Sequence, residues 1–98
     1  MDKMKEAIEK GKVRYLKNKY WKSIYDGAPE CAKGWYDLIF SLLDGGNDHE
    51  NEEAFSMMMD RVYDSLDDAG WDYIIDHTTH KMERHFLVEE RKKRSKTR

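Results

Sequence analysis

Apolar residues between positions 55 and 69 recur at the spacing of an α-helix, and this pattern constrains the fold more than any other feature of the chain. They fall at i, i+3, i+4 and i+7 positions, which share one side of a helix. These residues are Phe55, Met58, Met59, Val62, Leu66 and Ala69. Residues 50–69 are therefore predicted to form a helix. Directly opposite the apolar stripe lies an acidic row about 21 Å long at ~1.5 Å per residue: Glu53, Asp60, Asp64 and Asp67.

Glycine and proline divide the rest of the chain into further segments of helical length. Residues 2–25 carry apolar stripes on either side of Gly11, which predicts a helix kinked at that glycine or two successive helices; a strand over residues 12–21 is the alternative. Residues 29–43 begin at Pro29, a residue suited to the first turn of a helix, and residues 68–88 carry another helical stripe. Because no stretch alternates with period two, we predict an all-α fold, a small bundle of about four helices.

The 98 residues suffice for one small core, so we predict a single helical domain over residues 1–89. Residues 90–98 contain RKKRSKTR without an apolar anchor, which predicts a mobile basic C-terminal tail. The predicted core comprises Trp35, Leu38, Leu42, Met58, Met59, Val62, Leu66, Trp71 and Ile75.

The predicted helix over residues 29–43 is apolar on two sides, which is typical of a central helix or of one at an interface. If the monomer covers only one side, a two-fold homodimer would bury Tyr36, Phe40 and Leu43. Gly34 lies inside this helix, where glycine costs about 1 kcal/mol relative to alanine. We therefore expect another helix to approach closely beside Trp35. The similar stretch at Gly70 is expected to end the preceding helix or precede the last one.

Charge is strongly segregated along the chain. Residues 1–22 and 81–98 each carry eight basic and three acidic residues, whereas residues 23–80 carry two basic and fourteen acidic residues. The acidic middle could mimic nucleic-acid phosphates and bind a protein partner with a basic, nucleic-acid-binding surface. A solvated helix face is the simpler interpretation. The candidate partner-binding residues are Glu53, Asp60, Asp64, Asp67, Asp68 and Asp72.

The two basic ends support an alternative function, in which the protein associates with nucleic acid. Lysine and arginine would contact phosphates, and the tyrosines and tryptophan between residues 12 and 22 would stack on bases. The candidate nucleic-acid contacts are Lys12, Arg14, Lys17, Lys19, Arg91, Lys92, Lys93 and Arg94.

Motifs for catalysis are weak. No glycine-rich nucleotide loop and no H-E-x-x-H sequence occur. Asp76, His80 and Glu83 have a spacing that could bind a metal, but a solvent-facing patch is the preferred interpretation; His77 and His85 have no assigned role. Cys31 lies on an apolar stripe, which favours a core residue over a nucleophile. We therefore predict a protein that is not an enzyme and has no metal or cofactor.

The single cysteine and the charged, non-apolar N-terminal stretch predict a cytoplasmic protein without a secretory signal. No run reaches the ~18 apolar residues of a membrane span, so we expect no membrane association.

The stretch PECAKGWYDLIFSLL at residues 29–43 resembles the helix start of small phage-encoded proteins. The shared pattern is Cys31-x-x-Gly34-Trp35-x-x-Leu38-Ile39, and the second half of the chain departs from those proteins. The resemblance implies no activity. It implies a phage genomic setting and hence a host cytoplasm, where short acidic helical proteins commonly inhibit host or immune machinery, for example in an anti-CRISPR-like manner. The predicted function is that of an inhibitor or adaptor that binds a macromolecular partner.

Overall fold

The computed structural model describes residues 3–44 and 52–96, and within these ranges the chain forms six α-helices and no strand. They are α1 (Lys3–Tyr15), α2 (Lys19–Gly27), α3 (Glu30–Leu43), α4 (Glu52–Ser65), α5 (Asp68–Asp76) and α6 (Lys81–Lys96). The all-α class is confirmed, but the described part of the chain has six helices rather than about four. None of these helices is both long and apolar enough to cross a membrane.

The first additional break lies between α1 and α2. α1 runs through Gly11 to Tyr15, so the chain breaks after Tyr15 and not at that glycine. The side-chain oxygen of Asn18 instead caps α2 by accepting hydrogen bonds from the backbone N–H groups of Tyr20 and Trp21, at 2.9 and 3.4 Å. Asparagine is a favoured N-cap because it satisfies N–H groups that have no partner inside the helix.

The second additional break separates α5 from α6. The hydroxyl of Thr78 donates a hydrogen bond to the carbonyl of Ile74 at 2.6 Å. The carbonyl of Thr78 accepts hydrogen bonds from Nε and Nη2 of Arg84, at 3.2 and 2.9 Å. These bonds satisfy polar groups that the end of α5 leaves without helical partners, and they hold the corner between the two helices.

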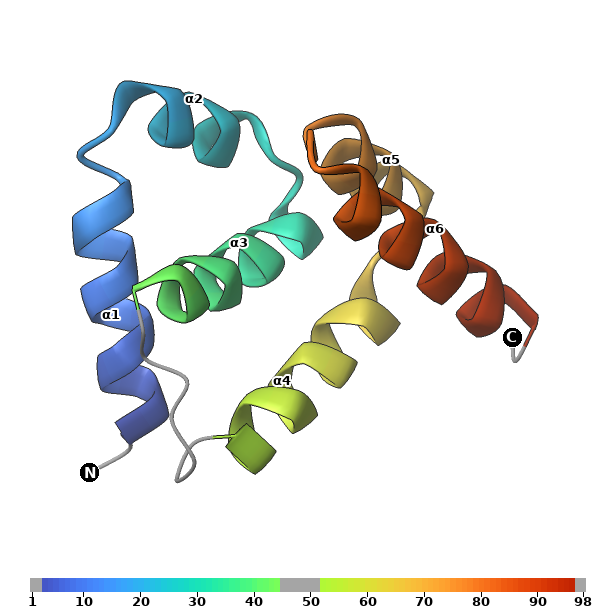
Figure 1. Cartoon of the computed structure of the whole chain (residues 1–98), viewed down its shortest axis with the longest axis horizontal. Coiled ribbons are helices and arrows are strands. Elements are labelled where there is room, and N and C mark those ends of the chain that lie inside the picture. Colours follow the sequence, from blue (N-terminus) through green and yellow to red (C-terminus); the bar gives the residue numbers. More distant parts are fainter. Residues whose placement is uncertain (1–2, 45–51, 97–98) are drawn as a thin grey trace.

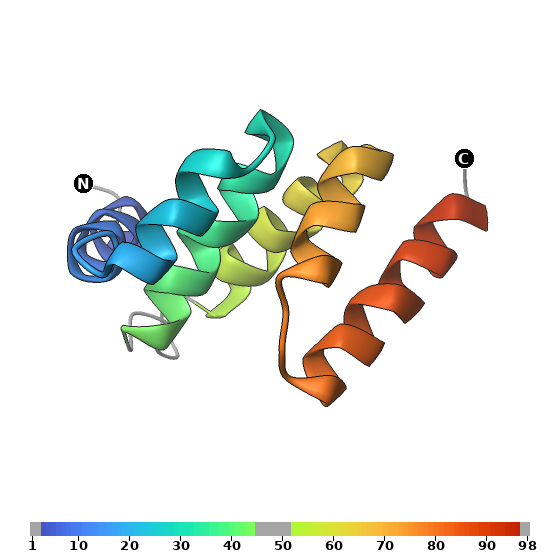
Figure 2. The ribbon, with the colours of Figure 1, turned by 90° about the horizontal axis from the view of Figure 1, so that it is seen from above.

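α3 lies at the centre of the molecule, with α1 and α2 on one side and α4, α5 and α6 on the other (Figures 1 and 2). On the first side, the Phe40 ring centroid lies 5.6 Å from those of Tyr15 and Trp21. On the second side, the buried Trp35 lies against the same cavity as Met59 and Tyr63 of α4. The two apolar sides of α3 are thus both used within one chain.

This arrangement contradicts the predicted homodimer face. Tyr36 and Phe40 are only 2% and 0% exposed in the monomer, and Leu43 alone of the three is exposed, at 52%. The side of α3 that was expected to need a partner is covered within the chain, because the aromatic side chains of α2 pack against Phe40.

The predicted core is partly correct. Trp35, Leu38, Leu66 and Trp71 are buried, whereas Leu42 is exposed. The remaining predicted members, Met58, Met59, Val62 and Ile75, are half-buried. Buried side chains that the prediction omitted are Ile24, Ala28, Ala32, Tyr63, Ile74 and Leu87.

Three glycines lie where helices approach closely. A Cβ atom on Gly34 would lie 3.3 Å from Cγ2 of Val62, which confirms the expected approach of another helix, here α4. The approach at Gly11 is closer, because a Cβ atom there would lie 2.6 Å from the backbone carbon of Phe40. Gly70 lies inside the first turn of α5, so it neither ends α4 nor precedes α5.

We predict that Gly11→Ala destabilises the protein more than Gly34→Ala. The backbone of α3 cannot move away from a methyl group at position 11, so the expected loss is about 1–3 kcal/mol in the free energy of unfolding. At position 34 the neighbour is a side chain, and the helix-propensity gain of about 1 kcal/mol offsets the tighter contact. Urea denaturation followed by circular dichroism measures both. Equal stability of the two variants would contradict the close packing of α1 on α3.

Candidate functional site

The structure brings the predicted acidic face and the predicted basic tail into contact with each other. The Arg94 guanidinium donates hydrogen bonds to Asp60 and Asp64 of α4 and to Glu90 of its own helix, with the Asp60 contact at 2.9 Å. It also lies over the Tyr63 ring, 5.1 Å from the centroid. Arg94 therefore joins α6 to the C-terminal half of α4.

A second arginine joins α6 to α5. Arg91 donates hydrogen bonds to Asp72 at 2.7 Å and to Asp68 at 3.2 Å. The hydrogen bond that Arg91 donates to Asp72 is the main effect that raises the pKa of Arg91 above its usual value, against the opposing effect of burial. Four of the six predicted partner-binding carboxylates are thus paired with two residues of the predicted tail.

These contacts correct the expectation of a mobile tail at residues 90–98. α6 continues to Lys96, and only residues 97 and 98 lie outside the described part of that segment. The sequence offered no apolar anchor for this segment because the anchor is ionic. Arg91 and Arg94 are three positions apart on one side of α6, where they meet carboxylates of two other helices.

The remaining predicted acidic residues have different surroundings. Asp67 is the N-cap of α5: its Oδ1 atom accepts a hydrogen bond from the backbone N–H of Gly70 at 2.8 Å and lies 3.5 Å from Sγ of Cys31. The hydrogen bond from Gly70, followed by that from Cys31, holds the pKa of Asp67 below its ordinary value. Glu53 is exposed in the first turn of α4.

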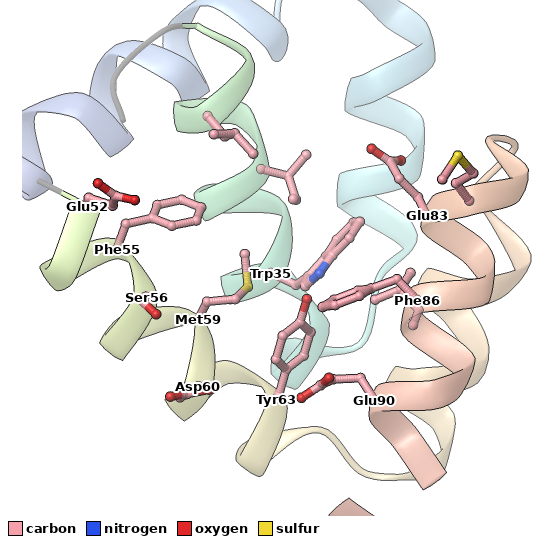
Figure 3. Close-up of a pocket in the computed structure, with 14 residues that line it drawn as sticks. Trp35, Glu52, Phe55, Ser56, Met59, Asp60, Tyr63, Glu83, Phe86 and Glu90 are labelled. Atoms are coloured by element: carbon pink, nitrogen blue, oxygen red, sulfur yellow. The ribbon is translucent and has the colours of Figure 1, made fainter. Parts of the chain in front are cut away.

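An apolar groove of about 640 Å³ lies between α3, α4 and α6 (Figure 3). Its apolar lining consists of Trp35, Ile39 and Leu42 from α3, Phe55, Met59 and Tyr63 from α4, and Met82, Phe86 and Leu87 from α6. The acidic side chains that line it, here called the acidic rim, are Glu52, Asp60, Glu83 and Glu90. The two walls converge where Tyr63 lies near Glu90, whereas Phe55 and Glu83 lie on opposite sides of the groove (Figure 3).

Large apolar side chains stay exposed along the groove. Met82 and Phe86 on α6 are 77% and 53% exposed, while Trp35 forms a buried floor. Burial is also the main effect that raises the pKa of the Tyr63 hydroxyl. A contiguous exposed apolar patch with a polar rim is the usual anatomy of a binding surface.

No protein-family model, curated protein or solved structure matches this chain. The groove is therefore interpreted from its own residues and geometry. Phe55 belongs to the predicted helical stripe of residues 50–69, and Met82 and Phe86 belong to that of residues 68–88. The helical spacing was visible in the sequence, but the exposure of Met82 and Phe86 depends on how far α4 and α6 diverge, which no residue spacing encodes.

The candidate nucleic-acid residues do not form one surface. The N-terminal helices and the C-terminal end of α6 lie at opposite ends of the molecule (Figures 1 and 2). Nζ of Lys12 lies 3.9 Å from Oδ1 of Asp37, and Nη1 of Arg14 lies 3.0 Å from Oδ1 of Asp44. Lys17 and Lys19 are exposed. On α6, each lysine pairs with a glutamate three residues earlier. Nζ of Lys92 lies 3.6 Å from the carboxylate of Glu89, and Nζ of Lys93 lies 3.9 Å from that of Glu90.

The histidines and Cys31 form no metal site in the described residues. His77 caps the end of α5, with its Nδ1 atom 2.8 Å from the carbonyl of Tyr73 and its ring stacked on that tyrosine. His80 and His85 are exposed. Within residues 3–44 and 52–96, no three His, Cys, Asp or Glu side chains converge as metal ligands, which excludes the Asp76, His80 and Glu83 set there.

We predict that Arg94→Ala lowers the free energy of unfolding by about 1–2 kcal/mol, because it leaves neighbouring carboxylates without their shared cation and removes the contact with Tyr63. The loss should shrink in 1 M salt, which screens the carboxylates. Lys92→Ala is the matched control, since Lys92 pairs with Glu89 of its own helix, and should change stability by less than about 0.5 kcal/mol. Denaturant titration measures both. Equal effects would show that Arg94 does not hold α6 to α4.

We predict that Asp67→Ala lowers the thermal midpoint at neutral pH, whereas Asp67→Asn retains the cap and most of the stability. Since the folded-state pKa of Asp67 is lowered, its ionised form stabilises the fold above the ordinary value of 3.8, and this contribution disappears as pH falls through the folded-state pKa. The difference between wild type and Asp67→Asn should therefore narrow on acidification. Melting curves by circular dichroism test this. An unchanged midpoint for Asp67→Ala would refute the capping role.

Proposed function

We propose that this protein is not an enzyme and that it inhibits or adapts a macromolecular partner by binding it. The observation that carries the proposal is the groove between α3, α4 and α6, in which exposed apolar side chains are bordered by the acidic rim. Apolar surface supplies most of the free energy of association, and a rim of one charge favours partners of the opposite charge. The proposed partner is a protein with a basic surface.

The proposed acidic surface is smaller than the full acidic row. Asp60, Asp64, Asp68 and Asp72 already have arginine partners within the chain. A partner that used these carboxylates would have to displace Arg91 or Arg94 from them. Glu53 and Glu83, both exposed in the first turns of their helices, are better placed to meet a partner's lysine or arginine residues. Nucleic-acid mimicry would thus operate beside the groove rather than along the whole of α4.

The resemblance of residues 29–43 to small phage-encoded proteins supports a phage setting for the proposed inhibitor, with a host nucleic-acid-binding protein as its proposed target and an anti-CRISPR-like role as one form of that function. A protein whose natural ligand is DNA or RNA presents the basic surface that the acidic rim complements. Long-range attraction between the two would speed their encounter.

Nucleic-acid association is the second candidate, and one observation favours it at the N-terminal end. Tyr20 is 57% exposed at the start of α2, beside the exposed Lys17 and Lys19. Exposed rings among lysines can stack on bases while the lysines contact phosphates. A low-salt gel shift with labelled single-stranded DNA, compared with the double variant Lys17→Glu/Lys19→Glu, tests this second candidate.

We predict that the double variant Glu53→Lys/Glu83→Lys loses partner binding by at least about tenfold, since two attractive charges become repulsive. The immobilised protein would be exposed to nuclease-treated lysate, and the retained proteins would be identified and then titrated individually. The control is Glu6→Lys/Glu9→Lys, which makes the same charge change on α1, with circular dichroism to confirm folding. Retention that disappears with nuclease, or that only the α1 variant abolishes, would contradict the proposal.

A further inference from the structure

Three helices present regular side-chain stripes to the same open volume. On α3 the stripe is Trp35, Ile39 and Leu42, with i, i+4 and i+7 spacing. The lining residues of α4 and α6 follow the same helical spacing, as Met82 and Phe86 illustrate. In a helical bundle, stripes of this kind pack against a neighbouring helix. Here they face a groove of about 640 Å³ that the described residues leave open.

We propose that this groove is a vacant helix position, and that its occupant is an amphipathic helix of the partner whose apolar stripe is bordered by lysine or arginine on both sides. The inference rests on the proposed function and specifies the structure of the partner segment. The α4 wall runs from Glu52 to Tyr63, a rise of about 16 Å at 1.5 Å per residue. Apolar anchors at i, i+4 and i+7 of a bound helix span about 10 Å by the same measure, so the groove is long enough for them.

Charge complementarity selects the border residues of that helix. The rim has acids on both walls, Glu52 and Asp60 on α4 and Glu83 and Glu90 on α6. Asp60 and Glu90 share Arg94, so a partner's cations would compete with that arginine there, and the exposed Glu83 is the rim acid best placed to meet them. A helix lying between the walls would place the residues beside its apolar stripe against these carboxylates. Lysine and arginine suit those positions because their carbon chains cover apolar surface while their charged ends reach the rim. Nucleic acid is disfavoured in the same place, since the rim repels phosphate.

The lining also suits a partner helix of this kind. Met59 and Met82 lie on opposite walls of the groove, and methionine adapts its unbranched, polarisable side chain to differently shaped apolar partners. Within a second copy of this chain, α1 is not free to fill the groove. The basic helix α1 is amphipathic, but its Gly11 side is packed directly on the backbone of α3.

The test uses a fluorescein-labelled 18-residue peptide with leucine at i, i+4, i+7 and i+11, lysine on both borders and alanine elsewhere. We expect binding by fluorescence anisotropy in the micromolar range, and a gain of helical circular dichroism when peptide and protein are mixed. Among the three tryptophans, the indole N–H resonance of Trp35 should shift most in ¹H–¹⁵N spectra, because Trp35 alone of them lines this groove.

Matched variants separate apolar docking from charge attraction. Met82→Ser/Phe86→Ser should weaken binding at least tenfold, whereas Val13→Ser/Met57→Ser, which alters exposed apolar residues outside the groove, should leave it unchanged. A peptide of the same composition with its leucines spread around the helix should bind at least tenfold more weakly. A peptide with glutamate in place of lysine should also bind at least tenfold more weakly.

Two outcomes would overturn the inference. If the scrambled peptide bound as tightly as the designed one, or if the designed peptide bound Met82→Ser/Phe86→Ser as tightly as wild type, charge alone would drive binding. The proposed acidic-surface function would still hold in that case if Glu53→Lys/Glu83→Lys abolished capture of the partner. A concentration-dependent dimer of the free protein that Met82→Ser/Phe86→Ser dissociates would assign the groove to a second copy instead.

Discussion

The burial of α3 on two sides is the constraint on which the rest of the structure depends. The contact between Gly11 and the Phe40 backbone fixes α1 against one side of α3, and Gly34 lets Val62 of α4 approach the other. Glycine is required at position 11 because any side chain there would collide with backbone. With α3 held in this way, Trp35 becomes the floor of a groove rather than the middle of a closed core.

Opposite charges that are far apart in the sequence meet in the fold. The chain reads as basic, acidic and basic segments, and both candidate sites were inferred from that segregation. Arg91 and Arg94 pair with Asp72 and Asp60 on neighbouring helices, so part of each candidate site is occupied by part of the other. Charge segregation in this sequence therefore serves α6 docking first, and only the carboxylates outside these pairs are available to attract a partner.

Helix content could be predicted from the sequence because apolar spacing reports it directly, as the stripe from Phe55 to Leu66 shows. The number of helices could not, because the additional breaks depend on local hydrogen bonds. At Asn18 the break depends on a side-chain cap to the N–H group of Tyr20, and at Thr78 the corner depends on a hydrogen bond from Arg84 six residues later.

Only the individual residues of the candidate site, and not their arrangement, could be predicted from the sequence. The acidic residues and the apolar stripes were visible, but a stripe cannot reveal whether its partner helix belongs to the same chain. Tyr36 and Phe40 were assigned to an interface and are buried, while Met82 and Phe86 belong to an apolar helix stripe and are exposed. Both outcomes have one cause, since each depends on where the neighbouring helices lie.

The open groove has a physical consequence for how the protein could recognise a partner. Exposed Met82 and Phe86 do not gain the stability of burial, about 1.5–3 kcal/mol for each large apolar side chain, in the free protein. A helix that filled the groove would bury them without any rearrangement of α3, which α1, α4 and α5 already hold. Because the walls need not reorganise, little of that free energy would be lost to ordering the site. Specificity would then depend on the acidic rim, which distinguishes a basic-bordered helix from other apolar segments.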